Sequence, residues 1–239
     1  MPDSSRPATD RPTARLLAEF LGSAGLAVIV LGSGVMASRL TDDVALQLLG
    51  NAWATALGLA VLIAVFASIS GAHFNPVVTL VDAALGGRRW AETARYIPTQ
   101  VLGCIAGAIV ANFMFELPAI SWSTTERATP GTLLSELVAT AGLVLVIFAL
   151  VRTGRGSLAA PAVGAYIGGA YFFTSSTSFA NPAITIGRIF SDSFAGIAAA
   201  SAPWFIAAQL LGAGVALVLV TVLFPAPASV TAPARLTSA

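Results

Sequence analysis

Long apolar segments alternate with short polar stretches along most of the chain. Six of these segments approach or exceed the roughly 20 residues that a helix needs to cross the hydrocarbon core of a bilayer. We expect transmembrane helices over residues 14–38, 44–70, 90–115, 132–151, 157–174 and 201–224. Two further apolar stretches, residues 75–85 and 181–190, are too short to cross. The pattern therefore predicts an all-α membrane protein with six transmembrane helices and two re-entrant half-helices.

Each short stretch begins with an Asn-Pro pair, as Asn75-Pro76-Val77 and Asn181-Pro182-Ala183. Asn is a favoured helix N-cap, and Pro is tolerated at the first helical position because its missing N–H would have no intrahelical partner there. A helix that starts inside an apolar chain leaves polar backbone that lipid cannot satisfy, so this backbone must be buried in protein or line a watery passage. We therefore expect the two half-helices to meet inside a membrane pore.

The chain also repeats itself. Glu19 and Glu136 lie in similar segments 117 positions apart, the Asn-Pro pairs are separated by 106 positions, and Gln100 and Gln209 by 109. Three transmembrane helices per half is an odd number, so the halves must form an inverted repeat, which places a functional site near the midplane. We expect one channel domain over residues 14–224, with repeat one at about 14–116 and repeat two at about 131–224, between a disordered cytoplasmic tail at 1–13 and a second cytoplasmic tail at 225–239.

Composition supports the membrane assignment and removes several other classes of protein. The chain is 56% hydrophobic and only 10% charged, whereas soluble domains average about 25% charged residues. The net charge of +1 gives no indication of a nucleic-acid partner. Cys104 and His73 are the only residues of their types, so a Cys-based or paired-His metal site is excluded, and no cofactor is expected.

The first apolar run has a signal peptide as its alternative interpretation. The run is too long for the roughly 7–15 apolar residues of a signal-peptide core, and it carries Glu19. We therefore interpret it as a retained transmembrane helix.

The arginines orient the protein. If the N-terminus is inside, nine of the twelve basic residues lie on the inner side and three on the outer side, which is a positive-inside bias. Both termini are then cytoplasmic, as six full crossings require. The inner residues are Arg6, Arg11, Arg15, Arg88, Arg89, Arg95, Arg152, Arg155 and Arg235, and the outer residues are Arg39, Arg127 and Arg188.

The two Asn-Pro motifs, the segment at residues 70–76 (SGAHFNP), the Glu19–Glu136 pair and the duplication resemble the aquaporin and aquaglyceroporin family, also called the major intrinsic proteins. The resemblance covers about residues 14–224 and departs from the family at Val77, where Ala is usual. It implies an aquaporin-like fold in a bacterial inner membrane, a homotetramer with one pore per subunit, and passive permeation of small uncharged solutes and water. It also implies that both Glu side chains accept hydrogen bonds from the re-entrant loop backbone; the alternative is that they couple transport to protons.

Asn75 and Asn181 are candidate pore residues. Their side chains either only cap the half-helices or also point N–H groups into the lumen. Two half-helix N-termini at mid-membrane would place two partial positive charges there, which would oppose cations and protons, while neutral hydroxyl-bearing solutes could accept hydrogen bonds from Asn. His73 either lines the cytoplasmic vestibule or braces its loop, or is a packed structural residue. Asp82 is expected near the inner mouth.

The predicted selectivity filter differs from that of water-selective family members, which combine an Arg three residues after the second motif Asn with an aromatic residue and a His. Here the Arg position is Ile184, the position in the fifth transmembrane helix is Gly169 and the loop position is Ser178. The position in the second transmembrane helix is Thr55 by ungapped counting, or Leu57 if the following connection is shortened by two residues, and we prefer Leu57. Such a filter would be wider and more apolar than a water filter.

Arg188 lies four residues beyond Ile184, on the same helical face. It either supplies a displaced positive charge at the outer vestibule, or snorkels or pairs with Asp192. A wide, apolar filter favours permeation of glycerol, urea or undissociated arsenious acid, as in the bacterial members associated with arsenic resistance that the chain resembles. The alternatives are a water-selective aquaporin and an ion-coupled secondary transporter; an intramembrane enzyme is disfavoured because one His, one Cys and no Lys leave little catalytic machinery.

Overall fold

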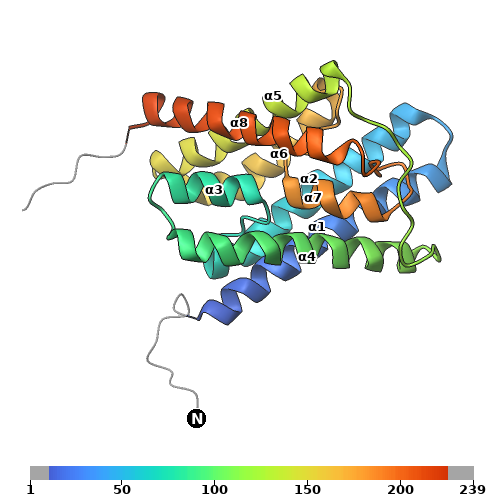
Figure 1. Cartoon of the computed structure of the whole chain (residues 1–239), viewed down its shortest axis with the longest axis horizontal. Helices are drawn as coiled ribbons and strands as arrows, with labels where there is room; N and C mark the ends of the chain where they lie inside the picture. Colours follow the sequence, from blue (N-terminus) through green and yellow to red (C-terminus); the bar gives the residue numbers. More distant parts are fainter. Residues whose placement is uncertain (1–10, 226–239) are drawn as a thin grey trace, which may run out of the picture.

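The computed structural model describes residues 11–225, and every regular element among them is a helix (Figure 1). The predicted tails at 1–13 and 225–239 lie almost wholly outside the described residues, but α1 begins at Pro12, inside the predicted N-terminal tail. The elements are α1 (Pro12–Leu40), α2 (Val44–Ser70), α3 (Pro76–Ala84), α4 (Trp90–Met114), α5 (Pro130–Arg152), the 3-10 turn η2 (Gly156–Leu158), α6 (Ala159–Phe173), α7 (Pro182–Gly187), the 3-10 turn η3 (Arg188–Phe190) and α8 (Ala202–Leu223).

The predicted fold of six spans and two half-helices is confirmed, with two differences in length. Among the described residues, five helices are long and apolar enough to cross a membrane. The fifth predicted span is divided between η2 and α6, whose 15 residues extend over only about 22 Å. The second half-helix is also shorter than expected, because its last turn tightens into η3, a common feature of helix ends.

The two halves pack in the same way. α1 packs on α2 and α4, α5 packs on α6 and α8, and α2 meets α6 between the halves. The half-helices α3 and α7 lie between α4 and α8 in Figure 1, and each contacts both of them. Each half-helix is therefore held by a long helix of its own repeat and by one of the other repeat. Both ends of the described chain lie toward the left of Figure 1, at the same end of the bundle.

Glycines permit the closest helix contacts. A Cβ atom added at Gly103 of α4 would lie 2.5 Å from the carbonyl oxygen of Phe20 in α1. In the second repeat, a Cβ atom at Gly212 of α8 would lie 2.4 Å from the carbonyl oxygen of Leu137 in α5. Small residues allow membrane helices to approach backbone to backbone, so these glycines set the spacing of α1 from α4 and of α5 from α8.

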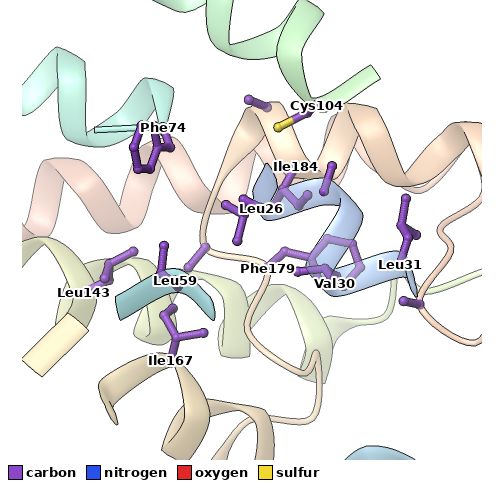
Figure 2. Close-up of a cluster of buried hydrophobic side chains, with 14 of the residues drawn as sticks. Leu26, Val30, Leu31, Leu59, Phe74, Cys104, Leu143, Ile167, Phe179 and Ile184 are labelled. Atoms are coloured by element: carbon purple, nitrogen blue, oxygen red, sulfur yellow. The ribbon is translucent and has the colours of Figure 1, made fainter. Parts of the chain in front are cut away.

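Buried hydrophobic side chains of both halves form one main cluster (Figure 2). Leu26 and Leu59 come from the first half, and Leu143 and Ile167 come from the second. All four also line an internal cavity. Part of the hydrophobic core is therefore also the wall of the cavity, so some of the positions that stabilise the fold shape the cavity as well.

We expect Gly103→Val to separate α1 from α4, because its side chain has no space against the backbone of Phe20. Overpacking of this kind costs about 1–3 kcal/mol or more. Thermal unfolding of the purified protein should give a lower midpoint for Gly103→Val than for the matched control Gly214→Val, because nothing lies within 4 Å of a Cβ atom at Gly214. Equal midpoints for the two variants would contradict the close-approach role of Gly103.

Candidate functional site

A reciprocal pair of hydrogen bonds joins the starts of the two half-helices. Asn75 Nδ2 donates to the carbonyl oxygen of Ala180, and Asn181 Nδ2 donates to that of Phe74, each over 2.8 Å. Each Oδ1 atom caps its own helix by accepting from a backbone N–H, at 3.1 Å for Asn75 and 2.9 Å for Asn181. The structure therefore brings the two Asn-Pro motifs together, and each asparagine holds the loop of the other repeat.

A cavity of ≈ 290 Å³ runs past both asparagines. A primary amide carries two N–H donors, and the reciprocal pair uses one of them on each side chain. Four helices contribute apolar stripes to the wall, mostly at a spacing of four residues. These residues are Leu26 and Val30 of α1; Leu59, Ile63 and Ala67 of α2; Leu143, Ile147 and Val151 of α5; and Ala159, Val163 and Ile167 of α6.

The Glu19 carboxylate holds the first re-entrant loop. Its Oε1 atom accepts from Ser70 Oγ at 2.6 Å and from the backbone N–H of His73 at 3.0 Å. Its Oε2 atom accepts from the backbone N–H of Phe74 and from Gln100 Nε2, both at 2.8 Å. Four donors thus satisfy a carboxylate that is fully buried.

Glu136 does the same for the second loop. Its Oε1 atom accepts from Ser176 Oγ at 2.6 Å and from the backbone N–H of Phe179 at 2.9 Å. Its Oε2 atom accepts from the backbone N–H of Ala180 at 2.9 Å and from Gln209 Nε2 at 2.6 Å. The loop-supporting bonds implied by the family resemblance are therefore present in both repeats. Neither carboxylate lines the cavity.

Several members of these networks were not predicted as site residues. Gln100 Nε2 also donates to Thr79 Oγ1, and Gln209 Nε2 also donates to Thr185 Oγ1, each over 2.9 Å. The signal that could have found them is the duplication itself. Ser70 and Ser176, and Thr79 and Thr185, have the same separation of 106 positions as the motif asparagines. The two glutamines were noticed as a repeat, but their bonds to buried carboxylates depend on contacts between helices.

The loop backbone before each half-helix is strained in the same way in both repeats. Ala72 (φ 49°) and Phe74 (φ 48°) correspond to Ser178 (φ 52°) and Ala180 (φ 48°). Residues other than Gly rarely adopt such positive φ values, which persist only where the surroundings enforce them. The N–H groups of Phe74 and Ala180 are held by Glu19 and Glu136, and those of Ala72 and Ser178 are held by the hydroxyl oxygens of Ser70 and Ser176.

The end of the cavity on the side where α1 begins, called the inner end from here on, is lined by His73 and Asp82. His73 Nδ1 lies 3.0 Å from Thr79 Oγ1, and its Nε2 lies 3.7 Å from Asp82 Oδ2. Arg88 Nε lies 3.3 Å from the same carboxylate oxygen, and Arg88 Nη2 donates to the carbonyl oxygen of Ser70 at 3.0 Å. His73 therefore faces the cavity and is also tied to its own loop, while Arg88 offsets the charge of Asp82.

At the outer end, the cavity is lined by Thr55, Tyr171, Ser178 and Ile184. Thr55 and Tyr171 are joined through their hydroxyl oxygens at 3.2 Å. The Oγ atom of Ser178 is buried without a hydrogen-bond partner in the described structure. Three of the predicted filter residues, namely Ser178, Ile184 and the ungapped choice Thr55, thus lie together in the cavity wall.

The other two predicted filter residues are wrong. Leu57 is 52% exposed on the outside of the bundle, and Gly169 is also exposed; neither lines the cavity. The physical reason is the same for both, because a shift of two residues turns a side chain by about 200° around a helix. Thr55 continues the wall-lining stripe of α2, and Tyr171 continues that of α6.

Arg188 adds a cation to the same end of the cavity. Its side chain is buried and lines the wall, its Cζ atom lies 3.3 Å from the centre of the Phe179 ring, and its Nε atom donates to the carbonyl oxygen of Ala195. Of the alternatives for Arg188, pairing with Asp192 is wrong, because no ion pair joins the two among the described residues. Asp192 Oδ1 accepts instead from the backbone N–H and the hydroxyl of Thr124.

A second arginine lies over the same aromatic ring. Arg127 Cζ is 5.6 Å from the centre of the Phe179 ring, and its side chain donates to the carbonyl oxygens of Gly196 at 2.6 Å and Phe194 at 2.8 Å. Arg127 lies in the loop between α4 and α5, where burial lowers the pKa of its guanidinium from the ordinary value. The Phe179 ring is thus accompanied by two guanidinium groups at the outer end of the cavity.

Comparisons with known proteins agree with this geometry. The family described as Major intrinsic protein matches residues 9–179. The chain is 46% identical over 207 residues to the aquaglyceroporin AqpS of Rhizobium meliloti, covering 87% of this chain and 88% of that protein. It is 35% identical over 152 residues to a glycerol uptake facilitator protein of Streptococcus pneumoniae, covering 56% of this chain and 63% of that protein. The solved structure of the aquaglyceroporin from Plasmodium falciparum has the same fold, with a TM-score of 0.70, 21% identity, and coverage of 88% of this chain and 96% of that chain.

Two half-helices that meet beside a cavity within a bundle of apolar helices define a multi-pass membrane channel. The chain belongs to the major intrinsic protein family. It is a passive channel for small uncharged solutes and water, and it is not an enzyme.

We expect Glu136→Gln to destabilise the protein, because the amide N–H₂ group would face backbone donors that now bond to the carboxylate. A buried donor that loses its acceptor lowers the free energy of unfolding by about 1–3 kcal/mol, and by more where a charged group is involved. The thermal unfolding midpoint should fall well below that of Glu116→Gln, a control at an exposed glutamate. A midpoint equal to the control would show that the carboxylate does not hold the loop.

Proposed function

We propose that this pore conducts small uncharged solutes, namely glycerol, urea or undissociated arsenious acid, together with water, and that it excludes protons and ions. The observation that carries the proposal is Ile184 in the wall of the outer cavity, three residues after Asn181, where water-selective family members have an arginine. An aliphatic side chain there leaves space and an apolar surface. Pore diameter and the hydrogen-bonding groups of the lining determine such selectivity.

The polar groups along the cavity suit a compact solute with several hydroxyl or amino groups. Asn75 and Asn181 each retain one N–H donor at the centre, and Thr55 and Tyr171 offer hydroxyl groups at the outer end. The remaining wall is predominantly apolar. A glycerol molecule could direct its hydroxyl groups to the polar positions and its carbon atoms to the apolar stripes, and arsenious acid is also neutral and carries hydroxyl groups.

Ion exclusion is proposed from two electrostatic features. The N-termini of α3 and α7 face each other at the reciprocal asparagine pair, so their partial positive charges oppose cations at the centre. Arg188 adds a full positive charge at the outer end. Glu19 and Glu136 are each occupied by four hydrogen bonds away from the cavity, which disfavours a proton-coupled transporter.

The relatives named as an aquaglyceroporin and a glycerol uptake facilitator support the choice of solutes. We further propose a homotetramer in a bacterial inner membrane with both termini in the cytoplasm. The family resemblance supports the homotetramer and the bacterial inner membrane, and the distribution of arginines supports the cytoplasmic termini.

A water-selective aquaporin is the second candidate. Tyr171 and Arg188 favour it, since they supply an aromatic ring and a cation at the outer end from positions other than the expected ones. Stopped-flow light scattering on proteoliposomes separates the two functions. We expect rapid glycerol, urea and arsenite flux that does not saturate and does not depend on a proton gradient. Fast water flux with glycerol and arsenite both excluded would favour the second candidate.

We expect Ile184→Arg to reduce glycerol and arsenite flux by about tenfold or more while reducing water flux less, because a guanidinium would narrow the outer cavity and add a second charge beside Arg188. Ile184→Val is the matched control, since it keeps the site apolar and removes one methylene group. Proteoliposome light scattering with each solute measures the effect. Equal losses of water and glycerol flux, or no loss of either, would contradict the filter role of Ile184.

We expect Arg188→Leu to increase proton or cation leakage through the pore, because the variant removes the only full positive charge among the residues that line the outer end of the cavity within the described chain. A pH-sensitive dye inside proteoliposomes measures proton entry under an imposed potential. Arg39→Leu is the control, since Arg39 lies on the outer side but does not line the cavity. If leakage is unchanged in Arg188→Leu, the half-helix dipoles alone are sufficient to exclude ions. That result would overturn the role proposed for Arg188.

A further inference from the structure

A basic groove lies outside the pore, where the first turns of α1 and α4 meet. Its volume is ≈ 50 Å³. Arg15 of α1 lies on one side, and Arg89 and Arg95 of α4 lie on the other, with Glu92 and Tyr96 between them. None of these five residues lines the cavity that passes the asparagines, so the mechanism of permeation does not account for them.

Positive charge exceeds negative charge in this groove. The Glu92 carboxylate is shared by Arg89 at 2.9 Å, Arg15 at 3.3 Å and Arg88 at 3.7 Å. Arg95 forms no side-chain hydrogen bond or ion pair within residues 11–225, and the Arg89 side chain is 84% exposed in spite of its bond to Glu92. A group with negative charge would therefore find two accessible guanidinium groups at the N-terminal end of α4.

The two helix ends reinforce this charge. The N-cap residues of α1 and α4 are Arg11 and Arg89, and neither forms a side-chain capping bond. The N-terminus of α1 carries a partial positive charge with no acidic residue in its first turn, whereas Glu92 in the first turn of α4 offsets part of the charge there. This contribution adds to that of the arginine side chains, which define the position of the groove.

Neighbouring side chains indicate the depth of the groove in the bilayer. Trp90, the first residue of α4, is exposed, as is Leu17 in the second turn of α1. Tryptophan side chains concentrate at the level of the lipid headgroups, and Leu17 offers apolar surface to the acyl region. The groove thus lies where the phosphate groups of one leaflet are found.

We propose that this groove binds the phosphate group of an anionic phospholipid in the cytoplasmic leaflet, with Arg89 and Arg95 as its principal contacts. Guanidinium groups bind phosphate through pairs of N–H donors, and basic pockets between transmembrane helices on the cytoplasmic side bind acidic headgroups. The inference rests on the proposed orientation of the chain in the membrane and is independent of the solute that the pore conducts.

Native mass spectrometry of the full-length protein tests the site by titration with phosphatidylglycerol or phosphatidylcholine of identical acyl chains. We expect phosphatidylglycerol to bind more tightly, and Arg89→Gln/Arg95→Gln to weaken that binding by about 25-fold, which is about fivefold per arginine. The matched control is Arg155→Gln, which removes a charge from the turn between α5 and η2. Glycerol flux through proteoliposomes checks that the double variant is folded.

Equal binding of phosphatidylglycerol by the wild type and the double variant would overturn the proposal. An equal loss in Arg155→Gln would also overturn it, because the effect would then follow net charge and not the groove. A parallel titration with inorganic phosphate distinguishes the two sources of the same chemistry. Phosphate that binds at the groove while the protein shows no preference between the two lipids would identify an anion site in place of a lipid site.

Discussion

The pore depends on the reciprocal hydrogen bonds from Asn75 to Ala180 and from Asn181 to Phe74. Lipid cannot satisfy polar backbone groups, so a helix can begin inside the bilayer only where protein or water accepts and donates in its place. Each asparagine meets this requirement in two ways. Its side-chain oxygen caps its own half-helix, and its side-chain N–H donates to the loop that precedes the other half-helix. The same two bonds set the position where the half-helix dipoles oppose each other. Helix stability and the electrostatic centre of the channel therefore come from one arrangement.

The buried glutamates make this arrangement geometrically possible. Isolated carboxylates are expensive to bury, but Glu19 and Glu136 each accept four hydrogen bonds, two of them from loop backbone. Those bonds hold Phe74 and Ala180 at positive φ, and the carbonyl oxygens of these two residues are the acceptors for the asparagines. The glutamates therefore act on the pore indirectly, through backbone conformation, and have no oxygen free to exchange protons with a solute.

The outer end of the cavity is lined by side chains from elements that are distant in sequence. Thr55 comes from α2, Tyr171 from α6, and Ile184 and Arg188 from the segment after the second motif. We expected a filter wider and more apolar than a water filter, with Arg188 either supplying a displaced positive charge or snorkelling or pairing with Asp192. Arg188 and Tyr171 both line the outer end, with Arg188 one helical turn beyond Ile184 and Tyr171 two residues beyond Gly169. The aliphatic position and the cation are thus separated along the pore axis, and this separation is the basis of the two filter variants proposed above.

The sequence by itself determined the spans, the two half-helices, the inverted repeat and the equivalence of Glu19 and Glu136 in the two repeats. Apolar length, Asn-Pro helix starts and internal duplication are local or periodic properties, so they can be found without any tertiary contact. The resemblance to the family indicated Ile184 and Ser178 as filter positions, and both line the cavity. Only the tertiary structure decided which face of α2 and α6 meets the cavity, because a difference of two residues rotates a side chain by about 200°. That rotation places Thr55 and Tyr171 in the wall and turns Leu57 and Gly169 away from it. The direction taken by Arg188 was likewise undetermined, because its partners, Phe179 and Ala195, are brought to it by chain segments that do not belong to its own helix.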